Sequence, residues 1–217
     1  MNYEGLVSYV GTATYGAQAL VAMWGAYCVI MVWRRIAQKR FRNEEAQIEF
    51  LTSIEEPLER GDYDAASAIC EGDSRAVPQL AHLAIANRNL GFSKLRQIVI
   101  DRFQRDLMAD LEYRISWINM VIKSAPMLGL FGTVLGMMGA FAKLAAAETV
   151  KPTELASDIS LALVTTAIGL AIAIPLGISM AAINVRIRKM EDLAISGLTH
   201  VLESLRGGLE GRQRRGG

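Results

Sequence analysis

Charged side chains are missing from three long stretches of this 217-residue chain, which cover residues 5–33, 124–142 and 159–185. A helix needs about 20 mostly apolar residues to cross a bilayer. Three buried helices of this kind would leave so short a chain little polar surface, so the pattern predicts three transmembrane helices. A cleaved signal peptide is not favoured, because no basic residue precedes the first stretch and the stretch exceeds the ~7–15 residues of a signal core.

Basic residues gather after the first and third stretches and are sparse between the second and third. They are Arg34, Arg35, Lys39, Arg40 and Arg42, then Arg186, Arg188 and Lys189, with only Lys143 and Lys151 in the hairpin. Because basic residues favour the cytoplasmic side, we expect the N-terminus outside, residues 34–123 inside, the 143–158 hairpin outside and the C-terminus inside.

The expected fold is all-α, a polytopic membrane protein with a helical cytoplasmic domain and long helices that extend from the membrane. Four regions follow from the pattern. They are 1–33 (N-terminal end and first span), 34–123 (cytoplasmic helices), 124–185 (second and third spans with a short outer hairpin) and 186–217 (cytoplasmic C-terminal helix and tail).

Residues 34–123 show helical spacing and few strand signals. We expect a helix over about 43–60 with a kink or break at Pro57, and a short helix over Tyr63–Cys70 after a Gly61-Asp62 cap. A third helix should start after Pro78 and end near residue 91. Ser93 then reads as the N-cap of a long helix that leads to the second span.

Composition excludes several functions. With 23 basic and 22 acidic residues, the chain lacks the basic excess of a nucleic-acid-coating protein. Two cysteines and two isolated histidines, His82 and His200, do not form a disulfide framework or a zinc site. We therefore expect no catalytic site, no cofactor and no metal. The Gly- and Arg-rich tail from Arg206 is expected to be disordered, with lipid headgroup contact as the alternative.

Small residues line one face of each of the last two spans. On the second span they are Gly129, Gly132, Gly136 and Gly139, and on the third Ala162, Thr166, Gly169 and Ala173, with Asp158 on the same face. Such faces allow close helix packing. Pro175 lies within the third span, where a proline usually kinks a helix.

These residues carry a resemblance to a known family. The string Ala125-Pro126…Gly129-Leu130-Phe131-Gly132-Thr133-Val134…Gly136-Met137…Phe141 resembles the second-span motif of the MotA/TolQ/ExbB family. The string Leu163-Val164-Thr165-Thr166-Ala167-Ile168-Gly169-Leu170…Ala173-Ile174-Pro175 resembles its third. Three spans point to the ExbB/TolQ branch.

The resemblance implies a pentameric inner-membrane ring around two copies of a single-span ExbD/TolR-like partner, which conducts protons and converts the proton-motive force into mechanical work. Thr133 and Thr166 match family threonines that face the lumen, and the adjacent Thr165 is assigned to the same proton path. Pro126 and Pro175 match family prolines. A TonB/TolA-like or motility effector and membrane lipids are further expected partners, and nucleic acid is not.

One position departs from the family pattern. ExbB-type members carry a glutamate five residues before the third-span threonine, and that position here is Leu161. Asp158 is the nearest acid. It takes a related role at the outer mouth, or the partner's aspartate suffices, or Asp158 caps the third helix. The alternative to a proton-driven motor is a non-conducting scaffold that assembles through the glycine faces.

Overall fold

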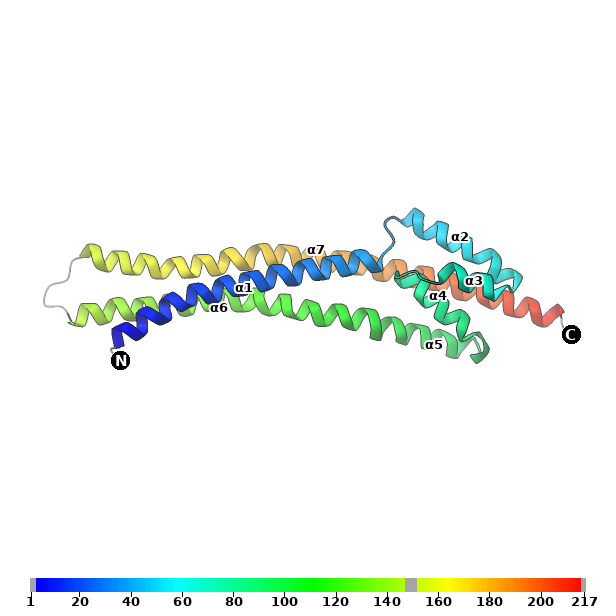
Figure 1. Ribbon diagram of the computed structural model, residues 1–217, viewed down its shortest axis with the longest axis horizontal. Helices are drawn as coiled ribbons and strands as arrows, with labels where there is room; N and C mark the ends of the chain where they lie inside the picture. The colour runs from blue at the N-terminus through cyan, green and yellow to red at the C-terminus, as the bar shows by residue number, and fades with distance from the viewer. Residues whose placement is uncertain (1–2, 147–151, 216–217) are drawn as a thin grey trace. The chain divides into compact units, whose positions relative to one another are not determined.

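The computed structural model describes residues 3–146 and 152–215, with side chains described for residues 13–145 and 152–208 (Figure 1). Within these residues every regular element is a helix, which confirms the all-α prediction. The helices are α1 Tyr3–Lys39, α2 Glu44–Arg60, α3 Tyr63–Cys70, α4 Ala76–Ala86, a 3₁₀ turn Arg88–Leu90, α5 Phe92–Arg102, a π-helical segment Phe103–Met108, α6 Ala109–Ala146 and α7 Pro152–Arg215.

Three of these helices, α1, α6 and α7, are long and apolar enough to cross a membrane. Their apolar windows are only 22–28% buried within the chain. Large side chains such as Met23, Leu130 and Ile178 are at least 60% exposed. Such faces are unfavourable in water and suit lipid or a neighbouring protein surface. The prediction of three spans is confirmed.

The chain divides into two compact units. The first unit comprises Met1–Met31 and Arg114–Ala182, and the second unit comprises Val32–Tyr113 and Ile183–Gly217. The apolar windows of α1, α6 and α7 fall mainly in the first unit, and α2 to α5 lie in the second.

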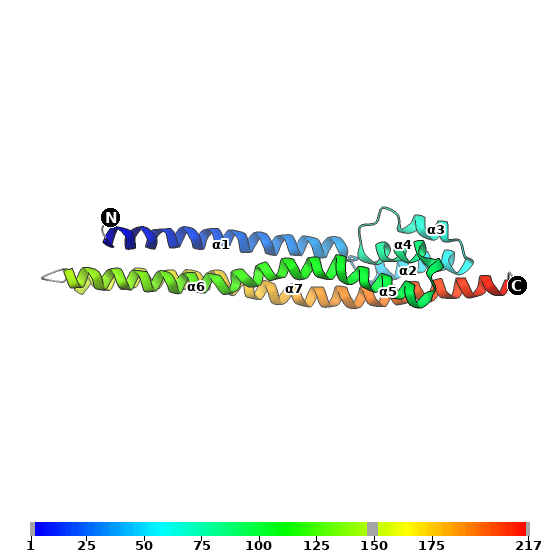
Figure 2. The same cartoon turned by 90° about the horizontal axis from the view of Figure 1, so that it is seen from below.

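In the first unit, α1, α6 and α7 lie side by side in both side views (Figures 1 and 2). Gly25 allows α1 to approach the other two closely, since a Cβ there would lie 2.7 Å from a Leu176 methyl and 2.8 Å from a Val121 methyl. Trp24 packs edge-on against Trp117 at 6.1 Å between ring centroids. Small buried residues and aromatic contacts therefore hold the three helices together.

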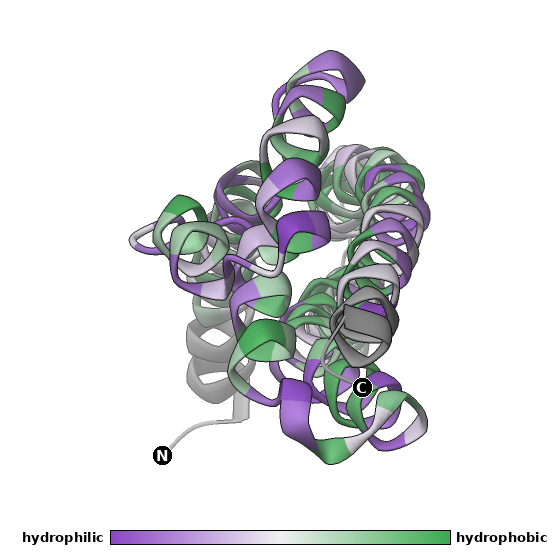
Figure 3. Ribbon diagram, turned by 90° about the vertical axis from the view of Figure 1, so that its right-hand side faces the viewer, coloured by the Kyte–Doolittle hydropathy of each residue, from purple (hydrophilic) through white to green (hydrophobic). Residues whose placement is uncertain are grey.

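The second unit has a core that α2 shares with the C-terminal part of α7. Ile54 and Leu58 on α2, and Val201 and Leu205 on α7, are fully buried. Figure 3 shows hydrophobic and hydrophilic residues alternating on its helices, the amphipathic pattern of helices that bury one face. Gln47 adds a hydrogen bond between the two, donating from Nε2 to the Leu193 carbonyl oxygen at 2.7 Å.

Helix ends agree with the sequence prediction at α2 and α3 and differ elsewhere. Gly61 has the left-handed φ of 76°, and Asp62 caps α3 by accepting from the Ala65 amide at 3.1 Å. The expected break at Pro57 is wrong, because α2 continues to Arg60 and buried Leu58 holds its last turn against the core. The start of α4 after Pro78 is also wrong. Pro78 lies in the first turn, where a missing N–H costs nothing.

Two further expectations are corrected. Ser93 is not an N-cap, since α5 begins at Phe92 after Gly91, whose φ is 79°. The tail from Arg206 is not disordered up to Arg215, because α7 extends that far. Packing explains this order: a Cβ on Gly208 would lie 2.2 Å from the Leu58 carbonyl oxygen, so α7 docks directly on α2. Residues 216–217 lie outside the described residues.

Candidate functional site

Three threonine hydroxyls meet between α6 and α7 within the first unit. Thr133 on α6 is hydrogen-bonded to Thr166 on α7, and its Oγ1 lies 3.4 Å from Oγ1 of Thr165. Thr165 is buried, whereas the other two are half-buried. We call these three residues the threonine cluster. It brings together all three threonines that the sequence singled out.

Two backbone carbonyl groups serve as shared acceptors for this cluster. Thr165 Oγ1 lies 2.9 Å from the Gly129 oxygen and 2.7 Å from the Ala162 oxygen. Thr133 Oγ1 lies 3.1 Å from each of the same two oxygens. A hydroxyl has one proton to donate and two lone pairs that accept. The cluster therefore has more acceptors than protons, and its hydrogen bonds can be rearranged without moving the helices.

Glycines, which have no side chain, allow α6 and α7 to approach each other closely. A Cβ added to the glycines that face α7 or α6 would meet atoms of the other helix at 2.6–2.8 Å, as at Gly129, Gly132, Gly136 and Gly169. For Gly169 the nearest atom is the Ala125 carbonyl oxygen at 2.6 Å, with Pro126 Cα at 3.2 Å. Gly139 is half-buried on α6, and Pro175 is exposed within α7, which remains one helix through it.

The first span contributes residues that the sequence analysis missed. Gln18 on α1 is 0% exposed, and its Nε2 donates to the Thr165 carbonyl oxygen at 2.7 Å. Tyr15 donates from its hydroxyl to the Leu161 oxygen at 3.2 Å. Thr14 is buried, and its methyl group would lie 3.1 Å from a Cβ on Gly132. A signal for Gln18 existed, because it is the only side-chain amide in the uncharged stretch 5–33.

Asp158 lies apart from the threonine cluster. The prediction that it caps the third helix is wrong, because α7 begins at Pro152 and Asp158 lies inside it. Its Oδ2 forms an ion pair with Lys143 Nζ on α6 at 2.7 Å. Eight residues separate it from Thr166, about 12 Å along the helix axis. The pair joins the ends of α6 and α7, whose connection over residues 147–151 lies outside the described residues.

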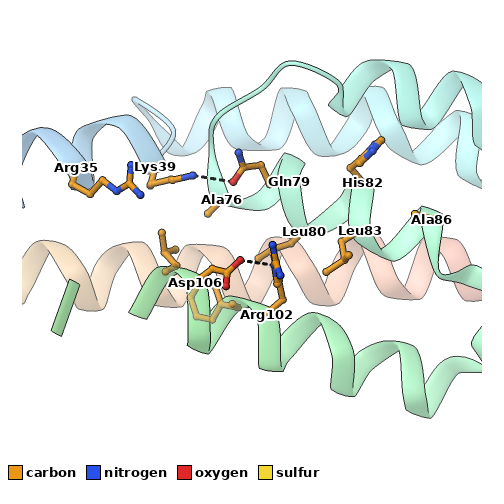
Figure 4. Close-up of a pocket in the computed structure, with 12 residues that line it drawn as sticks. Arg35, Lys39, Ala76, Gln79, Leu80, His82, Leu83, Ala86, Arg102 and Asp106 are labelled. Carbon is orange, nitrogen blue, oxygen red and sulfur yellow. Dashed lines mark hydrogen bonds and ion pairs between the residues drawn. The ribbon is translucent and has the colours of Figure 1, made fainter. Parts of the chain in front are cut away.

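The second unit contains a separate cavity of about 440 Å³, shown in Figure 4. Its lining includes Arg35, Lys39 and Arg102. Arg102 pairs with Asp106, and Arg35 pairs with Asp110 at 3.2 Å. Burial and the neighbouring Arg35 lower the pKa of Lys39. Both arginines are paired with carboxylates, and Lys39 donates to Gln79 at 2.9 Å, so we take the threonine cluster as the stronger candidate site.

Among the residues that the structure describes, no three His, Cys, Asp or Glu side chains lie close enough to hold a metal ion. The chemistry of the threonine cluster is that of neutral hydroxyls and carbonyl oxygens. Such groups donate and accept hydrogen bonds but do not ionise near neutral pH. They can solvate a proton or a water molecule by hydrogen bonding, but they cannot take up a proton themselves at that pH.

Residues 87–207, more than half of the chain, match the sequence model of the MotA/TolQ/ExbB proton channel family. The match includes both glycine faces and the threonine cluster. The chain belongs to this family, and its three apolar helices together with this membership support an inner-membrane location.

Individual relatives agree with this assignment. The Tol-Pal system protein TolQ of Haemophilus influenzae is 38% identical over 82 residues, which are 38% of this chain and 36% of the relative. The ExbB-like 2 protein of Helicobacter pylori is 32% identical over 111 residues, 51% of this chain and 72% of the relative. The biopolymer transport protein ExbB of Pseudomonas putida is 29% identical over 147 residues, 64% of this chain and 42% of the relative. The chain thus spans less than half the length of the TolQ and ExbB relatives.

Proposed function

We propose that this chain is the ring-forming subunit of a proton-driven motor in the inner membrane. Together with a single-span ExbD/TolR-like partner it conducts protons and converts the proton-motive force into mechanical work. The observation that carries the proposal is the threonine cluster, a set of rearrangeable hydroxyl groups inside the apolar part of α6 and α7. The family to which the chain belongs supports it.

The titrating group of the channel comes from the partner. The uncharged stretches 124–142 and 159–185 contain no acidic residue, and threonine hydroxyls do not ionise near neutral pH. Burying a charged carboxylate of a partner helix away from water costs free energy, and protonation of the carboxylate lowers that cost. Its protonation is therefore coupled to movement between wet and dry positions. The hydroxyls of Thr133, Thr165 and Thr166 supply hydrogen bonds along that movement.

Asp158 contributes through its ion pair. Lys143 neutralises its charge at 2.7 Å, and the side chain lies about 12 Å along the axis from the cluster. Asp158 does not act as a helix N-cap. We favour a structural role for it at the outer mouth of the channel, where its ion pair joins α6 to α7. The partner's carboxylate then titrates alone, in the absence of a glutamate at Leu161.

The exposed apolar faces of the spans are available for contact with lipid and with other subunits. Met127, Leu130 and Phe131 on α6 are 51–69% exposed, as are Ile174 and Ile178 on α7. Lipid, neighbouring copies and the partner helix would cover them. We propose a homopentamer around two partner copies, with the N-terminus periplasmic and the helices of the second unit in the cytoplasm. A TonB/TolA-like protein or a motility effector would receive the work.

Proton flux into vesicles tests this function. The chain is co-reconstituted with a single-span ExbD/TolR-like protein from the same organism, and native mass spectrometry first counts both subunits. Thr133→Val and Thr166→Val should lower the flux ~5–10-fold, the effect of losing one hydrogen bond of usual strength in the conducting state, and leave the assembly intact. Thr199→Val is the matched control, because Thr199 on α7 bonds its own helix at the Ile195 oxygen, at 2.9 Å and outside the cluster.

The alternative function is a non-conducting scaffold, which the close contacts at Gly132 and Gly136 favour. A scaffold would lose its assembly on Gly132→Leu and tolerate Thr133→Val and Thr166→Val. A chain that stays monomeric and ignores the partner would contradict the motor. So would unchanged flux in both threonine variants.

A further inference from the structure

Gln18 is a buried polar side chain in the first span whose hydrogen bonding is half satisfied. Its Nε2 donates to the Thr165 carbonyl oxygen at 2.7 Å. The reversed amide would place oxygen against oxygen, so this bond fixes which way the side chain points. Oε1 then points away from that carbonyl, is buried, and finds no hydrogen-bond donor among the residues that the structure describes.

This unused acceptor belongs to the same site as the hydroxyls. Gln18 bonds the backbone of Thr165, whose own hydroxyl is the buried member of the threonine cluster. One helical turn before Gln18, Thr14 places its methyl group against Gly132 on α6. All three spans therefore meet at the threonine cluster. The contribution of α1 is a side-chain amide, that of Gln18. A buried carbonyl oxygen without a donor costs free energy, most of all at membrane depth.

We propose that Gln18 is a positioning residue of the proton path, and that its Oε1 accepts a hydrogen bond from a water molecule that carries the proton past the threonine cluster. The inference rests on the proposed function. A neutral amide neither takes up nor releases the proton. It holds one O–H of the water, which leaves the oxygen of that water free to accept a proton from one side and its other hydrogen free to leave on the other side.

The test compares two glutamines that make the same bond. Gln18→Met keeps the length of the side chain and removes both its donor and its acceptor. Gln47→Met is the matched control, because Gln47 is also buried and also donates from Nε2 to an α7 carbonyl oxygen at 2.7 Å, but in the second unit and away from the cluster. Each variant is co-reconstituted with the partner, and subunit counts and melting midpoints are measured beside the proton flux.

We expect Gln18→Met to lower the flux ~10-fold, the factor that one hydrogen bond of usual strength provides, with assembly retained. Gln47→Met should lower the melting midpoint by about as much as Gln18→Met does. It should leave the proton flux unchanged. Equal flux losses in the two variants would mean that Gln18 only docks helices, and would overturn the inference.

Gln18→Glu is compared with wild type in proton flux, subunit count and melting midpoint at each pH, because a pure docking role would move flux and midpoint together. A glutamic acid side chain has one donor and one free acceptor only while protonated. Relative to wild type at each pH, flux in this variant should approach normal at low pH and fall as pH rises, with the subunit count unchanged. The uncharged stretches 5–33, 124–142 and 159–185 contain four titratable side chains, none of them a carboxylic acid: Tyr9, Tyr15, Tyr27 and Cys28.

The outcomes separate the two proposals. If wild type conducts, Thr133→Val does not, and Gln18→Met conducts normally, the inference about Gln18 is wrong and the motor function stands. If the wild-type complex passes no protons, the proposed function fails and the role of Gln18 fails with it. If the Gln18→Glu to wild-type flux ratio is flat with pH, or falls only in step with the melting midpoint, Gln18 acts by docking and the acceptor role is refuted.

Discussion

A single methyl group at Gly169 should separate the second and third spans. A Cβ at this position would lie 2.6 Å from the Ala125 carbonyl oxygen and 3.2 Å from Pro126 Cα. These are backbone atoms, which cannot swing away as the end of a side chain can. A carbon and a carbonyl oxygen in ordinary contact lie about 3.3–3.6 Å apart. In Gly169→Ala, α6 and α7 therefore move apart by about 0.7–1 Å.

The energetic cost follows from two opposing effects. Overpacking a tight contact costs about 1–3 kcal/mol, and contact with backbone lies in the upper part of that range. Alanine recovers about 1 kcal/mol through its better helix propensity. Gly177→Ala on the same helix isolates the first effect, because among the described residues no atom of another helix lies within 4 Å of a Cβ there. The two variants should differ by about 2–3 kcal/mol.

Thermal unfolding in detergent, followed by circular dichroism, measures this difference. About 2–4 °C per kcal/mol for a chain of this size predicts melting midpoints ~4–12 °C apart, with Gly169→Ala the lower. The threonine cluster should suffer as well, since a 0.7 Å separation stretches the 2.9 Å bond from Thr165 to the Gly129 oxygen beyond hydrogen-bond range. Equal midpoints for the two variants would refute the claim that backbone contact at Gly169 sets the helix spacing.

Three other predictions concern charges and a thiol. Lys143→Met should lower stability by less than ~1 kcal/mol, as for an exposed pair, and leave proton flux within about twofold; a tenfold loss would place Asp158 on the proton path. Burial, with Asp73 nearby, raises the pKa of Cys70 to about 12. Iodoacetamide at pH 8.5 should therefore alkylate Cys70 at least ~100-fold more slowly in the folded chain than in the urea-unfolded chain. Similar alkylation rates in the two states would contradict this prediction. That raised pKa stabilises the fold fully below pH 9.0 and progressively less up to about 12, which urea titrations at pH 8 and 10.5 would detect. A hydrogen bond from Arg75 lowers the pKa of Asp73 below 3.8. The free energy of unfolding of wild type should therefore fall as pH drops through that lowered value, and it should fall less steeply in Arg75→Gln. Identical pH dependence in the two proteins would exclude a stabilising role for this pair.

Local patterns were sufficient for the helices and for two sides of the candidate site. The helical spacing of glycine and threonine predicted which residues share a face of α6 and of α7, and the structure brings these faces together at Thr133, Thr165 and Thr166. Helix ends were less predictable. Asp158 resembled an N-cap by residue type, but α7 starts six residues earlier at Pro152, and the aspartate pairs with Lys143 instead.

Contacts between distant parts of the chain were beyond the reach of pattern. Gln18 and Thr165 are 147 positions apart, and their bond depends on the angle and depth at which α1 packs on α7. The C-terminal end of α7 shows the same limit. Its Gly- and Arg-rich composition is typical of disorder, yet the segment up to Arg215 is helical, and at Gly208 it lies directly against Leu58 of α2.

The sequence by itself determined the three spans, the all-α class and the small-residue faces, because segment length, hydropathy and helical period are properties of neighbouring residues. The tertiary structure alone decided that an amide from the first span joins the threonine cluster, that Asp158 forms an ion pair and does not cap a helix, and that α7 continues to Arg215. Each of these depends on which surfaces meet when long helices pack, and that is settled by the fit of many side chains at once.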